Sequence, residues 1–275
     1  MAPSGDAPVA AGGHHGRMPK IVIHHIPVCP FSQRLEILLA LKGCRDAVEF
    51  RVVDITQPRP PALLALSGGS SALPLAVAPD GSVLRESLVI LRWLDATLGP
   101  RIAAADPLAH AVEDLFATLC APFADAGYRL VMNQDLERRA ALHDALLARY
   151  AELDAFLVRH PVVAASGWAL SVFTPMFARF AFLDWYEAFV LPLEPRFARV
   201  RAWRDACLSH PATQQVAAEE VIKLYADYAL GFGNGALPPG RTRSSFAFEP
   251  HWRQRPWPPR DKYGAAWSDA ELGLL

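Results

Sequence analysis

Residues 71–95, SALPLAVAPDGSVLRESLVILRWLD, contain the pattern that decides the fold. The apolar run at 74–78 predicts a strand, and the Pro-Asp-Gly triplet at 79–81 predicts a tight turn into a second, antiparallel strand at 82–85. Leucines recur at three- and four-residue steps, which is typical of an amphipathic helix: Leu84, Leu88, Leu91 and Leu94. We therefore expect a strand-strand-helix unit in this stretch.

The preceding residues predict a strand-helix-strand unit. A short apolar run at 21–23 indicates a buried strand, and alternating apolar and polar residues at 48–53 indicate a second one. Between them, the sequence predicts a helix that follows Pro30 and ends at Gly43. The two units together predict an α/β domain of thioredoxin-like arrangement over residues 20–100.

Residues 105–230 predict an all-helical domain. The stretch 168–189 is apolar nearly all round, so we expect one central helix there, and two later helices fit 195–209 and 212–229. Two amphipathic faces precede them: Val112, Leu115, Phe116 and Leu119, then Leu146, Tyr150, Leu153 and Leu157. About five antiparallel helices of this kind would form a bundle.

The two ends of the chain are expected to be irregular. Residues 1–19 are rich in small residues and lack a charged start followed by an apolar run, so we expect a flexible leader and not a signal peptide. Residues 231–275 combine many prolines with Trp and Arg, and proline at that density prevents regular structure. We expect either a tail that is disordered or packed along the surface, or an arm that closes over the site or contacts a partner.

Composition and charge exclude several classes of protein. The net charge of -1 gives no general attraction to nucleic acid or to an anionic membrane. The uncharged stretch 162–178 is at the short limit for a membrane span, and Gly, Ser, Thr and Pro dilute it, so we interpret it as a buried helix. The four cysteines are too widely spaced for a disulfide framework or a zinc site, so we expect no metal and a cytoplasmic location.

Cys29 is the candidate catalytic residue because it lies between the first strand and the first helix. The unpaired N–H groups and the dipole at a helix start favour a thiolate, and Pro30 suits the first helical position. The alternative is a buried, inert cysteine, as we expect of Cys44, Cys120 and Cys207. Ser32 occupies the position of the second cysteine in a C-x-x-C motif, so an external thiol would have to resolve a mixed disulfide on Cys29.

Two further segments are candidates for binding a peptide-like ligand. Leu73 and Pro74 open the third predicted strand, and a cis bond there would let Leu73 offer its backbone N–H and C=O to a ligand. Glu86 and Ser87 meet at a predicted helix start, where N–H groups can hold a carboxylate and Glu86 can accept from an ammonium group. The alternative for this pair is an ordinary helix cap.

These motifs resemble the soluble glutathione transferases over about residues 20–230. The segment VCPFSQR (28–34) is similar to the active-site segment of the omega class and of the plant dehydroascorbate reductases. Residues 71–81 and 84–95 are similar to the family's proline turn, hairpin and Glu-Ser helix. The resemblance implies the glutathione transferase fold, with glutathione as co-substrate in the N-terminal domain and a second substrate against the helical domain. Phe31 could line this site or simply pack.

The resemblance also implies a role for each candidate residue. Cys29 would form a mixed disulfide with glutathione or activate its thiol, and Leu73 would bond the cysteinyl backbone. Glu86 and Ser87 would hold the γ-glutamyl end. Arg59, in an irregular loop, falls where the omega class has a lysine that reaches the glycyl carboxylate.

An enzyme is therefore expected, acting by thiol transfer on a small electrophilic or disulfide substrate, such as dehydroascorbate, mixed disulfides or glutathione conjugates; a homodimer is possible. The alternative is a transferase-fold interaction or regulatory protein without turnover. A third interpretation is an intracellular chloride-channel-like protein, which shares the CPFS motif, although 162–178 lies in the wrong half for that family's proposed membrane segment.

Two features depart from the transferases. Residues 166–170 lack the Asp of the usual capping box, so the helix must be capped otherwise, and the segment beyond residue 230 is additional.

Overall fold

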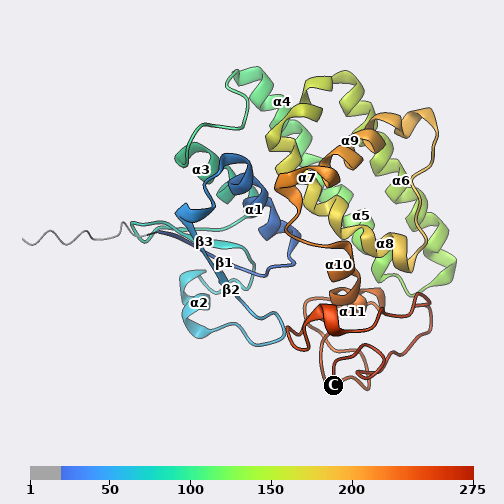
Figure 1. The fold of residues 1–275 in the computed structure, drawn as a ribbon. Helices are drawn as coiled ribbons and strands as arrows, with labels where there is room; N and C mark the ends of the chain where they lie inside the picture. Colours follow the sequence, from blue (N-terminus) through green and yellow to red (C-terminus); the bar gives the residue numbers. More distant parts are fainter. Residues whose placement is uncertain (1–19) are drawn as a thin grey trace, which may run out of the picture.

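The protein is described here by a computed structural model covering residues 20–275; the leader expected over 1–19 lies outside the described residues. Its N-terminal part is a four-stranded sheet of order β2-β1-β3-β4 (Figure 1). The strands are β1 Ile21–His25, β2 Val48–Val52, β3 Leu75–Val77 and β4 Val83–Leu84. The helices of this part are α1 Pro30–Lys42, α2 Pro61–Leu66 and α3 Ser87–Thr97. The predicted order of elements is therefore confirmed.

Local sequence explains where these elements begin and end. Helix α1 ends at Gly43, which adopts the left-handed conformation (φ 63°) and donates its N–H to the Ala40 carbonyl at 3.2 Å. The hairpin turns at Gly81 (φ 88°), as the Pro-Asp-Gly triplet predicts. The assignment of Leu84 to the helix is wrong, because Leu84 pairs with Ala76 as part of β4 and the helix starts only after it.

The second part of the chain is helical, as predicted. Its helices are α4 Pro107–Thr118, α5 Cys120–Met132, α6 Leu136–Arg159, α7 Gly167–Arg179, α8 Ala181–Tyr186, α9 Ala198–Ser209, α10 Ala218–Leu224 and α11 Ala226–Ala229. The predicted face of α6 is buried throughout: Leu146, Tyr150, Leu153 and Leu157. Leu115 was expected on the buried face of α4, but its side chain is 55% exposed. The single helix predicted over 212–229 is wrong, because α10 begins only at Ala218 and α11 is separate.

The central apolar stretch 168–189 forms two helices, α7 and α8, and not the one that was expected. The break falls at Phe180, whose ring covers Gly127 of α5 so closely that a Cβ there would lie 2.1 Å from a ring carbon. The break thus falls where the chain packs closely against α5, which the continuous apolar pattern does not reveal. No helix within residues 20–275 is long and apolar enough to cross a bilayer.

A cross-helix contact supplies the cap of α7. The Ser166 hydroxyl accepts hydrogen bonds from the N–H groups of Trp168 (3.2 Å) and Ala169 (3.4 Å). Glu113 of α4 accepts from that hydroxyl and also from the Ala104 N–H at 2.9 Å. The Ser166 side chain thus caps α7 without the Asp, and a carboxylate from another helix anchors its hydroxyl, so the expectation that α7 is capped otherwise is confirmed.

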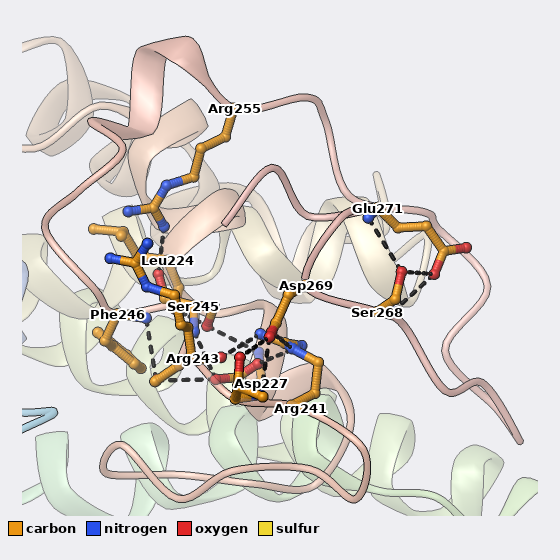
Figure 2. A network of polar contacts seen from close by, with 12 residues as sticks. Leu224, Asp227, Arg241, Arg243, Ser245, Phe246, Arg255, Ser268, Asp269 and Glu271 are labelled. Atoms are coloured by element: carbon orange, nitrogen blue, oxygen red, sulfur yellow. Dashed lines mark hydrogen bonds and ion pairs between the residues drawn. The ribbon is translucent and has the colours of Figure 1, made fainter. Parts of the chain in front are cut away.

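The segment 231–275, called the extension below, is irregular but packed. Apart from one short 3-10 turn at Trp252–Gln254, it winds beneath α10 and α11 at the lower right of Figure 1. Arg241 is its main anchor: the guanidinium forms ion pairs with Asp227 of α11 (3.2 Å) and with Asp269 (2.5 Å), and its side chain is 1% exposed (Figure 2). The alternative of a disordered tail is therefore wrong for residues 231–275, which pack against the helical part.

A second anchor of the extension is Lys262, whose side chain is fully buried. Its ammonium group donates to three carbonyl oxygens at the C-terminal end of α5, those of Leu130 (3.3 Å), Val131 (2.6 Å) and Asn133 (2.6 Å). The same group pairs with the Glu187 carboxylate at 2.7 Å. A side chain from the extension thereby supplies hydrogen bonds to carbonyls at the end of α5, where helical N–H partners run out.

Candidate active site

Sheet topology brings the candidate residues to one edge of the sheet. Cys29 follows the end of β1, and β3 runs antiparallel to β1 with His24 opposite Leu75. The start of β3, at Leu73-Pro74, therefore lies beside the end of β1. Strand β4 is antiparallel to β3, so Glu86-Ser87, just after β4, reaches the same edge. Residues far apart in sequence are thus neighbours because of strand direction alone.

The backbone of Cys29 is fixed while its thiol is left free of the helix cap. Cys29 is the N-cap of α1, with φ -70° and ψ 126°, and its side chain makes no capping hydrogen bond. Its N–H donates to the Ile26 carbonyl at 2.9 Å, and its carbonyl accepts from Ser32 (3.1 Å) and Gln33 (3.0 Å). The thiol is partly buried. It therefore lies at the positive end of the α1 dipole with no competing local bond.

A buried arginine supports the peptide bond that precedes Cys29. The Val28 carbonyl accepts from Nε (2.9 Å) and Nη2 (2.5 Å) of Arg179 at the end of α7, and from the Tyr225 hydroxyl (3.2 Å). Arg179 is fully buried and also donates to the Gln33 side chain. The sequence interpretation missed this residue, although a lone cation inside the apolar stretch 168–189 is a signal for it.

The Glu36 carboxylate, which lies near Arg179, is only partly ionised at neutral pH. Burial raises the pKa of Glu36 to about 7, although the nearby cations Arg179 and Arg45 act in the opposite direction. Burial also raises the pKa of Glu220. Near neutral pH, the positive charge of Arg179 is therefore only partly balanced.

Aromatic side chains surround the same region. Tyr225 contacts Tyr228 (ring centroids 5.0 Å apart), and Phe246 of the extension lies edge-on to Tyr225 at 4.9 Å. Tyr128 of α5 joins them at 5.7 Å from Tyr228. Burial raises the pKa of all three phenols, so each remains a neutral donor at physiological pH.

The other cysteines differ in exposure. Cys120 and Cys207 are buried, as expected. Burial raises the pKa of the Cys120 thiol and raises that of Cys207 to about 12, so neither supplies a thiolate near neutral pH. Cys44 was also expected to be buried, but it is only partly so because it lies in the turn after α1, where its Sγ contacts the Lys42 carbonyl at 3.3 Å.

Ser87 and Glu86 begin α3 in an arrangement that leaves ligand-binding capacity. Ser87 is buried, and its hydroxyl accepts from Nη1 of Arg34 at 2.9 Å, so its own proton is free for another acceptor. Glu86 is exposed, makes no capping hydrogen bond and has a φ of 66°, which is unusual for a residue with a side chain. The alternative of an ordinary side-chain cap therefore does not describe Glu86.

The remaining candidates lie around this edge. The Leu73-Pro74 bond is cis, as the sequence suggested. Arg59 lies in the loop after β2, which is parallel to β1 and so ends at the same edge, and its Nη1 donates to the Asp54 carbonyl at 3.2 Å. Phe31 is 41% exposed, with the Arg34 guanidinium 5.1 Å from its ring centroid. Within residues 20–275 no group of three His, Cys, Asp or Glu side chains is placed to hold a metal ion.

Comparison with known proteins agrees with this geometry. Residues 28–97 match the family model described as glutathione S-transferase, N-terminal domain. That range includes Cys29, the cis proline and the start of α3. Residues 28–97 are thus similar to the N-terminal domain of the glutathione S-transferases, and the fold of the chain is the glutathione transferase fold.

Individual transferases resemble the chain at low identity. Glutathione S-transferase U10 of Arabidopsis thaliana is 29% identical over 143 residues, which is 51% of this chain and only 60% of that relative's length. Glutathione S-transferase omega-1 of Sus scrofa is 22% identical over 197 residues, covering 70% of this chain and 78% of the relative. A rice glutathione transferase solved in complex with glutathione superposes with a TM-score of 0.62 at 24% identity, covering 74% of this chain and 96% of that one.

Proposed function

We propose that the protein is a glutathione-dependent thiol transferase of omega-like type, with Cys29 as the nucleophile. The observation that carries the proposal is the position of Cys29: a thiol at the N-terminus of α1, not used as a cap, on a backbone held from three sides. A serine at position 32 leaves no internal cysteine to resolve a mixed disulfide.

The reaction divides into two balanced exchanges. The Cys29 thiolate attacks the sulfur that belongs to glutathione in a mixed disulfide, forms a bond to it and releases the other sulfur as a thiolate, which takes up a proton. The thiolate of a second glutathione then attacks the glutathione sulfur on Cys29, which releases the Cys29 thiolate and forms oxidised glutathione. The substrate is released as a free thiol, one reduced glutathione is consumed, and its sulfur leaves bonded to the glutathione of the original mixed disulfide as oxidised glutathione.

In this proposal, the residues at the edge of the sheet beside Cys29 bind glutathione. The domain at 20–100 holds glutathione, with Ser87 donating to the γ-glutamyl carboxylate and Glu86 accepting from its amino group. Leu73 pairs with the cysteinyl backbone, and Arg59 reaches the glycyl carboxylate. The second substrate lies against the helical domain at 105–230, where the partly exposed Tyr128 and Tyr228 supply a neutral aromatic surface.

A transferase-fold protein without turnover is the second candidate. The packing of Phe246 onto Tyr225 favours it, because the extension then covers the tyrosine that hydrogen-bonds the peptide bond before Cys29. Such a protein need not bind glutathione or exchange its thiol.

The deciding experiment is intact mass spectrometry after incubation with oxidised glutathione. We expect one glutathione adduct on the wild-type protein, no adduct at that site in Cys29→Ala, and release by excess reduced glutathione. Cys44→Ala is the matched control, because Cys44 is also partly buried, and it should label like the wild type. No adduct, or equal labelling of the wild type and Cys29→Ala, would refute thiol transfer and favour the second candidate.

A further inference from the structure

The first residues of the extension lie between the two halves of the molecule. Residues 231–235 read GFGNG, and the backbone at both ends has positive φ, +85° at Gly231 and +80° at Gly235. A Cβ on Gly231 would lie 3.3 Å from the Met132 carbonyl oxygen of α5. A Cβ on Gly235 would lie 2.8 Å from the Ile55 carbonyl oxygen in the loop after β2. Glycine at 235 therefore allows backbone to touch backbone across the two parts.

The loop that Gly235 touches is a small rigid unit. The Asp54 carboxylate accepts from the Thr56 N–H (2.8 Å) and from the Thr56 hydroxyl (2.7 Å). The Asp54 carbonyl accepts from Nη1 of Arg59 at 3.2 Å. Nε of Arg59 also donates to the Ser71 carbonyl, at a longer 3.4 Å. A displacement of Ile55 would thus move the nearer of the two carbonyls that hold the Arg59 guanidinium.

Beside this contact the loop and the extension separate. A cavity of about 350 Å³ lies between them, lined on one side by Asp54, Thr56 and Gln57 and on the other by residues of the extension that include Gly235, Leu237 and Phe248. The loop is thus not packed continuously against the extension, and the contact at Gly235 borders open space. The extension can resist displacement because Arg241 ties it to α11.

We propose that Gly235 is a positioning residue for glutathione: by its contact with Ile55 it sets the loop that orients Arg59 toward the glycyl carboxylate. The extension, which the sequence resemblance does not cover, thereby determines affinity for one end of the ligand. This inference rests on the proposed function, since it concerns the same site.

The test compares two ligands that differ only at the glycyl end. Reduced glutathione and γ-glutamylcysteine share the γ-glutamyl and cysteinyl groups, but γ-glutamylcysteine lacks the glycine. Binding of each to the full chain is measured by titration calorimetry for wild type, Gly235→Ala and Gly240→Ala. Gly240 is the matched control, because its φ is +79° and nothing lies within 4 Å of its added Cβ.

We expect Gly235→Ala to weaken glutathione binding by about tenfold, comparable to loss of one charge-assisted hydrogen bond. Its affinity for γ-glutamylcysteine should stay within about twofold of wild type, and Gly240→Ala should leave both affinities within about twofold. Arg59→Met should reproduce the discrimination without strain at residue 235, and the double variant Gly235→Ala/Arg59→Met should be no worse than either single variant.

Each other outcome overturns a defined claim. Equal weakening of both ligands in Gly235→Ala would show general damage to the site and overturn the inference, as would wild-type affinity for glutathione in that variant. If the losses of glutathione affinity in the two single variants add up in the double variant, Gly235 acts independently of Arg59 and the inference is overturned. In these cases the wild type still binds glutathione and the proposed function stands; a wild type that binds neither ligand would overturn both.

Discussion

Replacing Arg241 with methionine tests whether the extension is held by its buried ion pairs. Methionine has a similar length and is apolar, so it fills most of the space but leaves Asp227 and Asp269 without their cation. Arg241 and Asp227 are each 1% exposed at the side chain, and Asp269 is 8% exposed. The carboxylates can therefore gain little from water after the substitution.

The expected cost can be worked from the charges. Burial opposes ionisation of Asp269, but hydrogen bonds from Thr242 and Arg241 outweigh it and lower the pKa to about 2. Against an ordinary value of 3.8, this shift corresponds to about 2 kcal/mol of stability at neutral pH. Asp227, whose pKa burial already raises, would also lose its partner. Removing one member of a buried pair costs about 3–5 kcal/mol, and we expect a loss in that range.

The assay is urea unfolding followed by tryptophan fluorescence, at pH 7 and along a descending pH series. Because the pKa of Asp269 is lowered in the folded state, its contribution is present above about pH 4 and is lost as the pH falls toward 2. The gap between wild type and Arg241→Met should therefore narrow in acid. Arg253→Met, on an exposed arginine of the same segment, is the control and should cost under about 0.5 kcal/mol. A loss below about 1 kcal/mol for Arg241→Met, or a gap independent of pH, would refute the reasoning.

Three further substitutions test other parts of the structure. Burial raises the pKa of Glu36 from 4.5 to about 7, so the folded wild type loses stability as the pH rises from 4.5 to 7. Glu36→Gln does not ionise, and its stability relative to wild type should rise by up to about 3 kcal/mol over that range. Urea midpoints of the two proteins that stay parallel across pH would contradict this. Gly127→Ala places a methyl group against the Phe180 ring and should lose about 1–3 kcal/mol despite better helix propensity; a higher thermal midpoint would show that the ring yields. Ser166→Ala removes the α7 cap and one of the two hydrogen bonds to the Glu113 carboxylate, so we expect a loss of about 1–2 kcal/mol in urea unfolding; no loss would mean that water replaces the hydroxyl.

The features that local sequence could predict are those that neighbouring residues determine. The hairpin follows from Pro79-Asp80-Gly81, and the start of α1 follows from Pro30, because each signal acts within a few residues. The placement of Cys29 at a helix start was predictable for the same reason. The cis state of the Leu73-Pro74 bond was suggested by its context at the start of a strand.

The features that were missed depend on residues distant in sequence. Arg179 is separated by about 150 positions from the carbonyl it supports, so the apolar stretch around it can indicate its burial but not its partner. The cap of α7 uses Glu113 from another helix, and a motif search around Ser166 cannot find it. The division of the central apolar stretch falls at Phe180, which packs over Gly127 of α5, a contact that only the packed structure reveals. Tertiary contacts decided each of these cases.

The contact of Lys262 with the end of α5 has a consequence for where the protein can be cut or recombined. A chain shortened to residue 230 would match the length over which the sequence resembles other transferases, yet it would leave three α5 carbonyls and the Glu187 carboxylate without their cation. A chimera that carried another transferase's C-terminus would meet the same defect. The boundary of resemblance is thus not a boundary of cooperative folding, and an exchange of C-terminal segments should keep Lys262 together with α5 as one module.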